Sequence, residues 1–136
     1  MTAKTSGVHH VGLTVPDVRT AQTFFEEGLG FKKVGEKPDY PAVFVSDGTI
    51  LLTLWQAEDP ATAVPFDRRR GIGLHHLALR VESESVLREL HESLAQRTDV
   101  TIEFAPEPLG KAPLRHMMVR IPGDIRLELV APVSPA

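Results

Sequence analysis

Hydrophobic and polar residues alternate in two segments of the chain that nearly repeat one another, 7–15 and 73–81. In each segment apolar side chains occupy every second position, which is typical of a strand with one buried face. His10 stands on the opposite face in the first copy, and His76 takes the same place 66 residues later (76 − 10) in the second. A pattern repeated at this distance indicates two copies of one structural module.

The first module is predicted to have the element order βαβββ. Asp17 is a suitable N-cap for a helix that runs to about Glu27, with apolar residues at helical spacing on one side. Gly28 and Gly30 are expected to end that helix. The predicted strands of this module are 7–15, 31–35, 42–45 and 50–56, with a hairpin turn at 46–48.

The second module is predicted to repeat that order. Ser83 is expected to cap a helix that runs to about Gln96. A loop is expected at 105–113, because this segment is rich in proline and glycine, which interrupt regular structure. The predicted strands are 75–81, 100–104, 114–121 and 125–131, followed by a frayed tail at 132–136.

These elements predict an α+β fold in which two tandem βαβββ modules, about 7–57 and 73–131, pair their curved mixed sheets around a central cavity. The linker between the modules, 58–72, contains three consecutive arginines, and such a run is usually solvated. A chain of 136 residues has the size of one domain, so we expect 1–136 to form a single domain.

Composition narrows the classes of partner. A net charge of −3 argues weakly against nucleic acid or an anionic membrane as the main partner. The chain has no cysteine, which excludes a disulfide framework and a thiolate zinc site. The first residues lack the apolar core of a signal peptide, and no apolar run approaches membrane-spanning length. We therefore expect a cytoplasmic protein that binds a small molecule, without nucleic-acid or membrane partners.

Two paired βαβββ modules with His10 and His76 at equivalent strand positions resemble the vicinal oxygen chelate superfamily over about residues 7–131. That superfamily includes glyoxalase I, extradiol ring-cleaving dioxygenases, and fosfomycin-resistance and bleomycin-binding proteins. The resemblance implies a metal held by the first and last strands of each module, with His10, His76 and Glu128 as ligands. The fourth position, a glutamate in the glyoxalase I pattern, is Thr53 here, which argues against a glyoxalase I reaction.

The residue types of this set suit a catalytic metal. Two neutral imidazoles and one carboxylate form a facial triad with open positions, which suits Fe(II), Mn(II) or catalytic Zn(II). We therefore expect one divalent metal per site, binding a small substrate through adjacent oxygens. The alternative is that the histidines are merely exposed or hydrogen-bonded and that Glu128 points outward. His9 and His75 are expected on the opposite side of the pleat, where they cap the strands or stack near the helices.

Four further residues are candidates for the site. His116 is predicted to lie near the Glu128 strand, as an acid–base group or a partner that orients a ligand, although simple exposure explains it equally well. Arg80 either receives an anionic substrate or pairs with a carboxylate. Thr53 is expected to turn its hydroxyl toward the metal cavity. Met118 is a candidate for lining a substrate pocket, although core packing is the commoner role of methionine.

Three functions follow as hypotheses. The first is a metal-dependent enzyme of the glyoxalase/dioxygenase type, acting as a dioxygenase or lyase. The second is a metal-free, bleomycin-resistance-like binding protein, which needs an apolar groove instead of ligands. The third is a fosfomycin-type thiol transferase, for which Lys111 and Arg115 only partly supply a cation-binding loop. Open sheet edges and the family resemblance also predict a homodimer.

Overall fold

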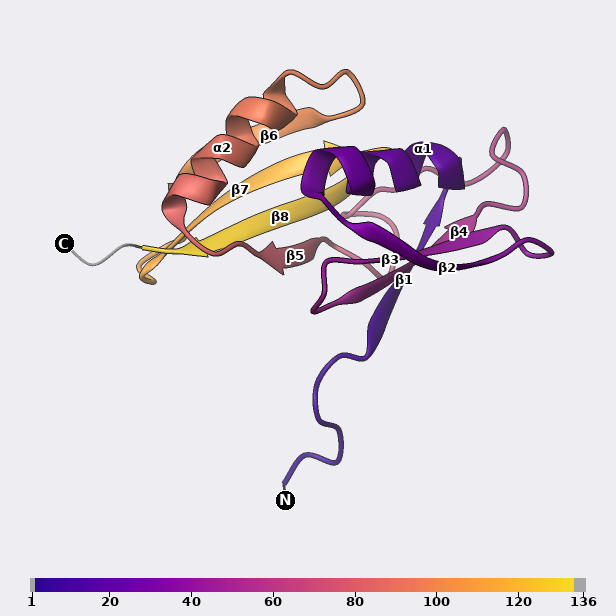
Figure 1. The fold of residues 1–136 in the computed structure, drawn as a ribbon, viewed down its shortest axis with the longest axis horizontal. Helices are drawn as coiled ribbons and strands as arrows, with labels where there is room; N and C mark the ends of the chain where they lie inside the picture. The colour runs from indigo at the N-terminus through magenta and orange to yellow at the C-terminus, as the bar shows by residue number, and fades with distance from the viewer. Residues whose placement is uncertain (1, 134–136) are drawn as a thin grey trace. The chain divides into compact units, whose positions relative to one another are not determined.

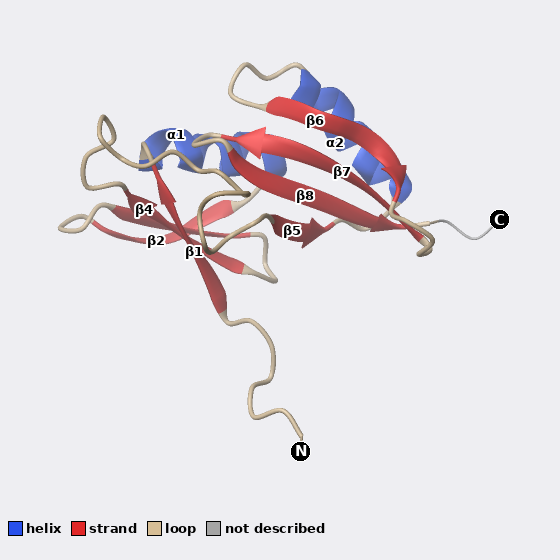
Figure 2. Ribbon diagram, turned by 180° about the vertical axis from the view of Figure 1, so that it is seen from behind, coloured by secondary structure: helices blue, strands red, loops and turns tan. Residues whose placement is uncertain are grey.

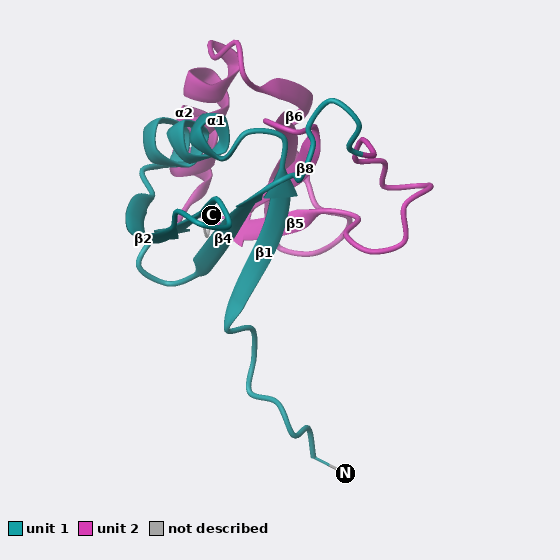
Figure 3. Ribbon diagram, turned by 90° about the vertical axis from the view of Figure 1, so that its right-hand side faces the viewer, with its two compact units in different colours: residues 1–63 teal, residues 64–136 magenta. Residues whose placement is uncertain are grey.

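The computed structural model describes residues 2–133 (Figure 1; Figure 2). The predicted frayed tail lies outside the described residues from position 134 onward. The chain divides into two compact units, Met1–Ala63 and Val64–Ala136, which Figure 3 colours separately. No helix in the described part of the chain has the length and apolar character needed to cross a membrane.

Unit 1 contains a four-stranded mixed sheet and one helical segment. Its elements are β1 (His10–Val15), α1 (Val18–Thr23), a π-helical turn η1 (Phe24–Gly28), β2 (Lys32–Lys37), β3 (Ala42–Ser46) and β4 (Leu51–Gln56). The strand order is β1-β4-β3-β2, in which β1 runs parallel to β4 and the other neighbours are antiparallel. This arrangement confirms the predicted βαβββ order.

The helical segment of unit 1 begins at the predicted N-cap. The Asp17 side chain accepts hydrogen bonds from the backbone N–H groups of Arg19 and Thr20, at 2.8 and 3.1 Å. The segment buries Phe24 and Phe25 completely, but it continues as a π-helical turn where the prediction was α-helix. A π turn shifts later side chains off the 3.6-residue period, so the spacing of apolar residues does not reveal it.

Replacing Asp17 with alanine is expected to lower the free energy of unfolding by about 1 kcal/mol, because two backbone donors lose their acceptor. Urea unfolding of the variant and the wild type measures this difference. Asp39→Ala removes a carboxylate from an exposed turn and is the control, with an expected change below about 0.5 kcal/mol. Equal changes in the two variants would contradict the capping role.

Unit 2 repeats the topology of unit 1. Its elements are β5 (Leu77–Arg80), α2 (Glu84–Ala95), β6 (Thr101–Pro108), β7 (Leu114–Ile121) and β8 (Ile125–Pro132). The strand order is β5-β8-β7-β6, with β5 parallel to β8, so that β8 corresponds to β4 of unit 1. Two modules of this kind confirm the predicted α+β fold class.

Two predicted boundaries in unit 2 are wrong. The loop expected at 105–113 begins only after Pro108, because β6 continues through the prolines. Strand β6 is an edge strand, where a residue without a backbone N–H is tolerated. Strand β5 begins at Leu77, so His75 and His76 precede the strand and do not alternate within it.

Strand β8 sorts its side chains to the two faces of the sheet. Leu127 and Leu129 are buried on one face of the sheet, and α2 packs against β8 (Figure 2). Arg126 and Glu128 alternate with them and point to the other face, yet each is only 8% exposed. Charged side chains are rarely buried to this extent without polar partners, so the partners of Arg126 and Glu128 identify the candidate site.

Candidate functional site

Glu128 is the centre of a group of contacting polar side chains in unit 2, which we call the polar cluster. Its members are His75, His76, Glu103, His116, Arg126 and Glu128. In the register of the sheet Glu128 lies between Ala78 of β5 and Met118 of β7, so all three residues share a face. Its Oε2 atom accepts a hydrogen bond from Nδ1 of His116 at 2.5 Å. Its Oε1 atom lies 3.2 Å from Nε2 of His76. The structure therefore brings together three residues that the sequence singled out: His76, His116 and Glu128.

His116 lies on β7 with a side chain that is only 13% exposed. Its ring packs edge-on against Phe104, with 4.9 Å between ring centroids, and its Nε2 atom lies 3.8 Å from Oε1 of Glu107. These contacts hold the ring where its Nδ1 atom meets Glu128, which is the arrangement of a residue that orients a ligand. Its role as an acid–base group stays a prediction.

The position predicted for His75 is wrong, because its ring lies beside that of His76 and not across the pleat. The two Nδ1 atoms are 2.8 Å apart, and the rings meet edge to face at 74°. The Nδ1 atom of His75 also lies 3.3 Å from Nη1 of Arg126. Desolvation, together with the charge of Arg126, lowers the pKa of His75. Sequence reasoning missed Arg126, although it shares the alternation of Glu128 on β8.

Arg126 is held in turn by Glu103. The Arg126 Nε atom donates to Glu103 Oε2 at 3.0 Å, and Arg68 approaches Oε1 of the same carboxylate at 3.5 Å. The hydrogen bond from Arg126 is the main cause of the lowered pKa of Glu103, so this carboxylate is an anion at neutral pH. Arg68 comes from the arginine run that was expected to be solvated, and its side chain is only 31% exposed.

The residues predicted in unit 1 lie on the corresponding strands. His10 is the first residue of β1, and its Nδ1 atom lies 2.9 Å from Nδ1 of His9, so the contact seen in unit 2 occurs twice. Both of these side chains are exposed. The predicted metal ligands are therefore distributed over the two units, with His10 in unit 1 and with His76 and Glu128 in unit 2.

Thr53 occupies the position on β4 that Glu128 occupies on β8. Its Oγ1 atom accepts a hydrogen bond from Nε1 of Trp55 at 2.8 Å and donates to the carbonyl of Val11 at 3.5 Å. Gly12 lies opposite, where an added Cβ would come within 3.1 Å of that hydroxyl. The hydroxyl thus has partners within unit 1, and its role toward a substrate or a metal stays a prediction.

A cavity of about 330 Å³ lies beside the polar cluster of unit 2. Its lining residues are Ala78, Leu79, Arg80, Leu114, Val130 and Pro132. In the register of the sheet, Arg80 pairs with Val130, which is the second residue after Glu128 on the same face. Among the described residues that line this cavity, Arg80 alone is charged, and the register of the sheet places the cavity next to Glu128. Met118 is 4% exposed beside Glu128, and its role in lining a substrate pocket stays a prediction.

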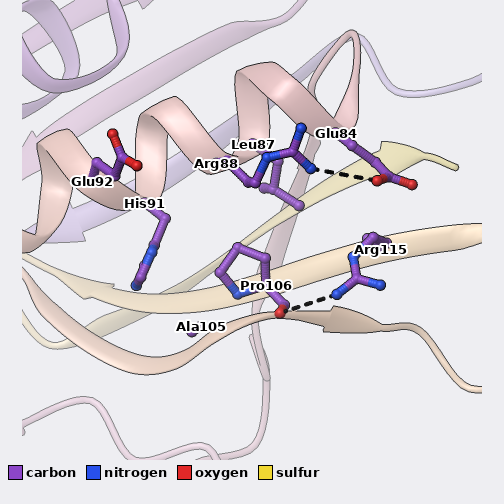
Figure 4. Close-up of a pocket in the computed structure, with 8 residues that line it drawn as sticks. All are labelled: Glu84, Leu87, Arg88, His91, Glu92, Ala105, Pro106 and Arg115. Atoms are coloured by element: carbon purple, nitrogen blue, oxygen red, sulfur yellow. Dashed lines mark hydrogen bonds and ion pairs between the residues drawn. The ribbon is translucent and has the colours of Figure 1, made fainter. Parts of the chain in front are cut away.

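A larger cavity of about 490 Å³ lies between α2 and strands β6 and β7 (Figure 4). Its polar side chains form local contacts: Arg88 with Glu84 at 3.5 Å, and Arg115 with the carbonyl of Pro106 at 3.4 Å. Arg115 alternates with His116 on β7, so this cavity opens on the opposite face of the sheet from Glu128. Arg115 therefore lies on the face opposite Glu128, and its partial role in cation binding for a thiol transferase stays a prediction.

The side chains of the polar cluster can be compared with the ligands that the predicted divalent metal needs. In residues 2–133, no group of three or more His, Cys, Asp or Glu side chains is arranged so that it could hold a metal ion. His76 and Glu128 nevertheless fit as two ligands, because an imidazole nitrogen and a carboxylate oxygen face one another at 3.2 Å. The second oxygen of Glu128 is engaged by His116. Unit 2 thus places two of the predicted metal ligands side by side, with His116 against the second oxygen of Glu128.

The duplicated βαβββ topology is that of the vicinal oxygen chelate folds. The profile of the Glyoxalase/Bleomycin resistance protein/Dioxygenase superfamily matches residues 7–129, and the protein belongs to this family. A glyoxylase/bleomycin resistance protein/dioxygenase domain from Frankia sp. EAN1pec is 27% identical, with a TM-score of 0.80 over 98% of this chain and 96% of that chain.

Two further solved structures share the fold at lower identity. Lactoylglutathione lyase from Agrobacterium tumefaciens is 18% identical, with a TM-score of 0.69 over 95% of this chain and 96% of that chain. A fosfomycin resistance protein from Listeria monocytogenes is 17% identical, with a TM-score of 0.67 over 93% of each chain. A comparison with curated proteins found no match.

Proposed function

We propose that the protein is a metal-dependent enzyme of the glyoxalase/dioxygenase type, with His76 and Glu128 as two of its metal ligands. The observation that carries this proposal is the 3.2 Å approach of His76 Nε2 to Glu128 Oε1, because Fe(II), Mn(II) and catalytic Zn(II) accept this pair of donors. A divalent ion with open positions supplies Lewis-acid chemistry to a substrate that binds through adjacent oxygens. The sequence predicts His10 as the third ligand.

The residues around the ligand pair orient the carboxylate and select the substrate. His116 donates to one oxygen of Glu128, which restricts the carboxylate rotamer and leaves the other oxygen for the ion. Arg80 offers a guanidinium to an anionic group, and the apolar walls of its cavity receive a hydrocarbon part. The substrate class that suits this surface is a small oxyanion with an apolar body.

Protein purified without chelator is expected to bind about one divalent ion per chain, and His76→Ala is expected to weaken that binding by more than about tenfold. Competition against a chromophoric chelator measures the affinity for Mn²⁺ or Zn²⁺. His91→Ala removes a histidine from α2, outside the cluster, and is the matched control. Equal affinities in the wild type and His76→Ala would refute the proposal, and His10→Ala tests the third ligand in the same assay.

One observation favours a second function, the metal-free binding of a small molecule. Each oxygen of Glu128 already has a histidine partner, so the cluster can be satisfied by hydrogen bonds and ion pairing alone. A binding protein of this kind would keep its ligand affinity after treatment with a chelator, whereas the proposed enzyme would lose it.

The homodimer also stays a prediction, and sedimentation at micromolar protein concentration tests it.

A further inference from the structure

We propose that Arg126 and His75 fix the tautomer of the His76 ring, so that the lone pair of its Nε2 atom faces Glu128. These four residues form a continuous chain of polar contacts within unit 2. The successive distances are 3.3 Å from Arg126 Nη1 to His75 Nδ1, 2.8 Å between the two histidine Nδ1 atoms, and 3.2 Å from His76 Nε2 to Glu128 Oε1. The inference rests on the proposed function, because its consequence concerns His76 as a metal ligand.

The hydrogens along this chain can be assigned one after another. A guanidinium nitrogen can only donate, so the Nδ1 atom of His75 carries a lone pair where Arg126 meets it. The 2.8 Å contact between the two Nδ1 atoms then requires its hydrogen to be on His76. In its neutral form the His76 ring carries a single hydrogen, and its Nε2 atom is then unprotonated.

The unprotonated Nε2 atom of His76 faces a carboxylate oxygen of Glu128, which is also an acceptor. Two acceptors at 3.2 Å repel one another unless a positive charge, either a proton or a metal ion, lies between them. A hydrogen bond at Nδ1 that fixes the tautomer is the usual way in which a protein prepares a histidine ligand. Arg126 and His75 are thus positioning residues, which act on a bound ion through His76.

Arg126 is well anchored for this role. It is 8% exposed, and its Nε atom donates to Glu103 at 3.0 Å, so the guanidinium is oriented before it meets His75. Arg68 approaches the same carboxylate at 3.5 Å. The contact with His75 is therefore the end of a partly buried ion-pair network whose central side chain, that of Arg126, is buried.

Unit 1 provides an internal comparison. His9 and His10 form the same contact, with 2.9 Å between their Nδ1 atoms and rings at 81°. The residue that corresponds to Arg126 is Leu51 (126 − 75), which pairs with His10 across β1 and β4. Leucine cannot donate a hydrogen bond, so nothing equivalent to Arg126 directs the hydrogen between these two rings.

Long-range ¹H–¹⁵N NMR of ¹⁵N-labelled, metal-free protein reads the histidine tautomers directly, at a pH well above the ordinary histidine pKa of about 6.5. In the wild type we expect the hydrogen of His76 on Nδ1 and that of His75 on Nε2. In Arg126→Leu, which copies the residue of unit 1, His76 is expected to shift toward the Nε2–H form, because that hydrogen can bond to Glu128. The histidine signals of unit 1 should not change.

Metal affinity is the second readout. Arg126→Leu is expected to bind Mn²⁺ or Zn²⁺ roughly 10- to 100-fold more weakly than the wild type. Arg120→Leu is the matched control, because Arg120 pairs with Arg126 across β7 and β8 but is exposed. Arg126→Lys keeps a donor and should restore the wild-type tautomer. If Arg126→Leu fails to fold, His75→Ala tests the same link by removing the acceptor at an exposed position.

These measurements distinguish a failure of the tautomer inference from a failure of the proposed metal-dependent function. A wild-type His76 that carries its hydrogen on Nε2 would overturn the inference, and so would an unchanged His76 tautomer in both Arg126→Leu and His75→Ala. The expected tautomers in a protein that binds no divalent metal would support the hydrogen-bond assignment and overturn the proposed function.

Discussion

Replacing Glu128 with alanine is expected to weaken divalent-metal binding by more than about 100-fold, because residues that only support a ligand are already worth 10- to 100-fold. Glu128 is the only anion among the three proposed ligands, and it is the residue that both His76 and His116 contact. Its removal also leaves the Nδ1–H group of His116 without an acceptor in a position that is 13% exposed. Titration calorimetry with Mn²⁺ or Zn²⁺ measures the loss.

Two further variants separate the charge of Glu128 from its size. Glu128→Gln keeps the side-chain volume and one oxygen but removes the charge, so its metal affinity should fall nearly as far as that of the alanine variant. Glu107→Gln makes the same change on β6, where the carboxylate is 55% exposed and 3.8 Å from His116, and it should bind metal like the wild type. Wild-type affinity in Glu128→Gln would contradict a ligand role.

The strand repeat predicted more of the cluster than any single motif did. The constant spacing within each repeat placed Glu128 on the last strand of unit 2, beside the strand that carries His116. His116 was predicted to lie near that strand, although simple exposure explained it equally well, and the structure places its Nδ1 atom 2.5 Å from Oε2 of Glu128. Such predictions succeed because the register of a hairpin with a short turn is fixed by the pleat and the turn geometry.

The contacts of His75 and Arg126 could not be predicted from local patterns. Because β5 begins at Leu77, the two preceding histidines do not follow the alternation of the strand. Arg126 contacts His75 from a strand that comes 51 residues later in the chain. Such a contact depends on side-chain rotamers, which the hydrophobic pattern does not specify.

The burial of Arg126 and Glu128 points to the candidate site, and this burial could not be predicted from the sequence. An arginine and a glutamate at alternate positions of a strand are ordinary on a solvated face, and nothing in the sequence distinguishes that case from a buried one. In β8 both residues are 8% exposed, so each needs partners that lie outside the strand. Those partners, Glu103 for Arg126 and the two histidines for Glu128, are what make this face of the sheet a candidate site.

Leu127→Ala is expected to lower the free energy of unfolding by about 2–5 kcal/mol. After the loss of metal binding in Glu128→Ala, this is the second large effect that we expect. Leu127 is fully buried on β8, the strand that pairs with both β5 and β7. Truncation there removes apolar contacts and leaves a cavity that rigid sheet neighbours cannot collapse to fill. The corresponding residue of unit 1 is Leu52 (127 − 75), which is equally buried, so Leu52→Ala should cost a similar amount.

Urea unfolding measures both changes, and Val34→Ala is the control, because Val34 is 61% exposed and its truncation should cost less than about 0.5 kcal/mol. A Leu127→Ala variant as stable as the control would contradict the position of this side chain in the core.

The two leucine variants also differ in what they should do to the polar cluster. Leu127 lies between Arg126 and Glu128 on β8, so a looser strand there should disturb the proposed His76 tautomer in the folded protein. That tautomer depends on residues of unit 2 alone, and it should therefore survive Leu52→Ala.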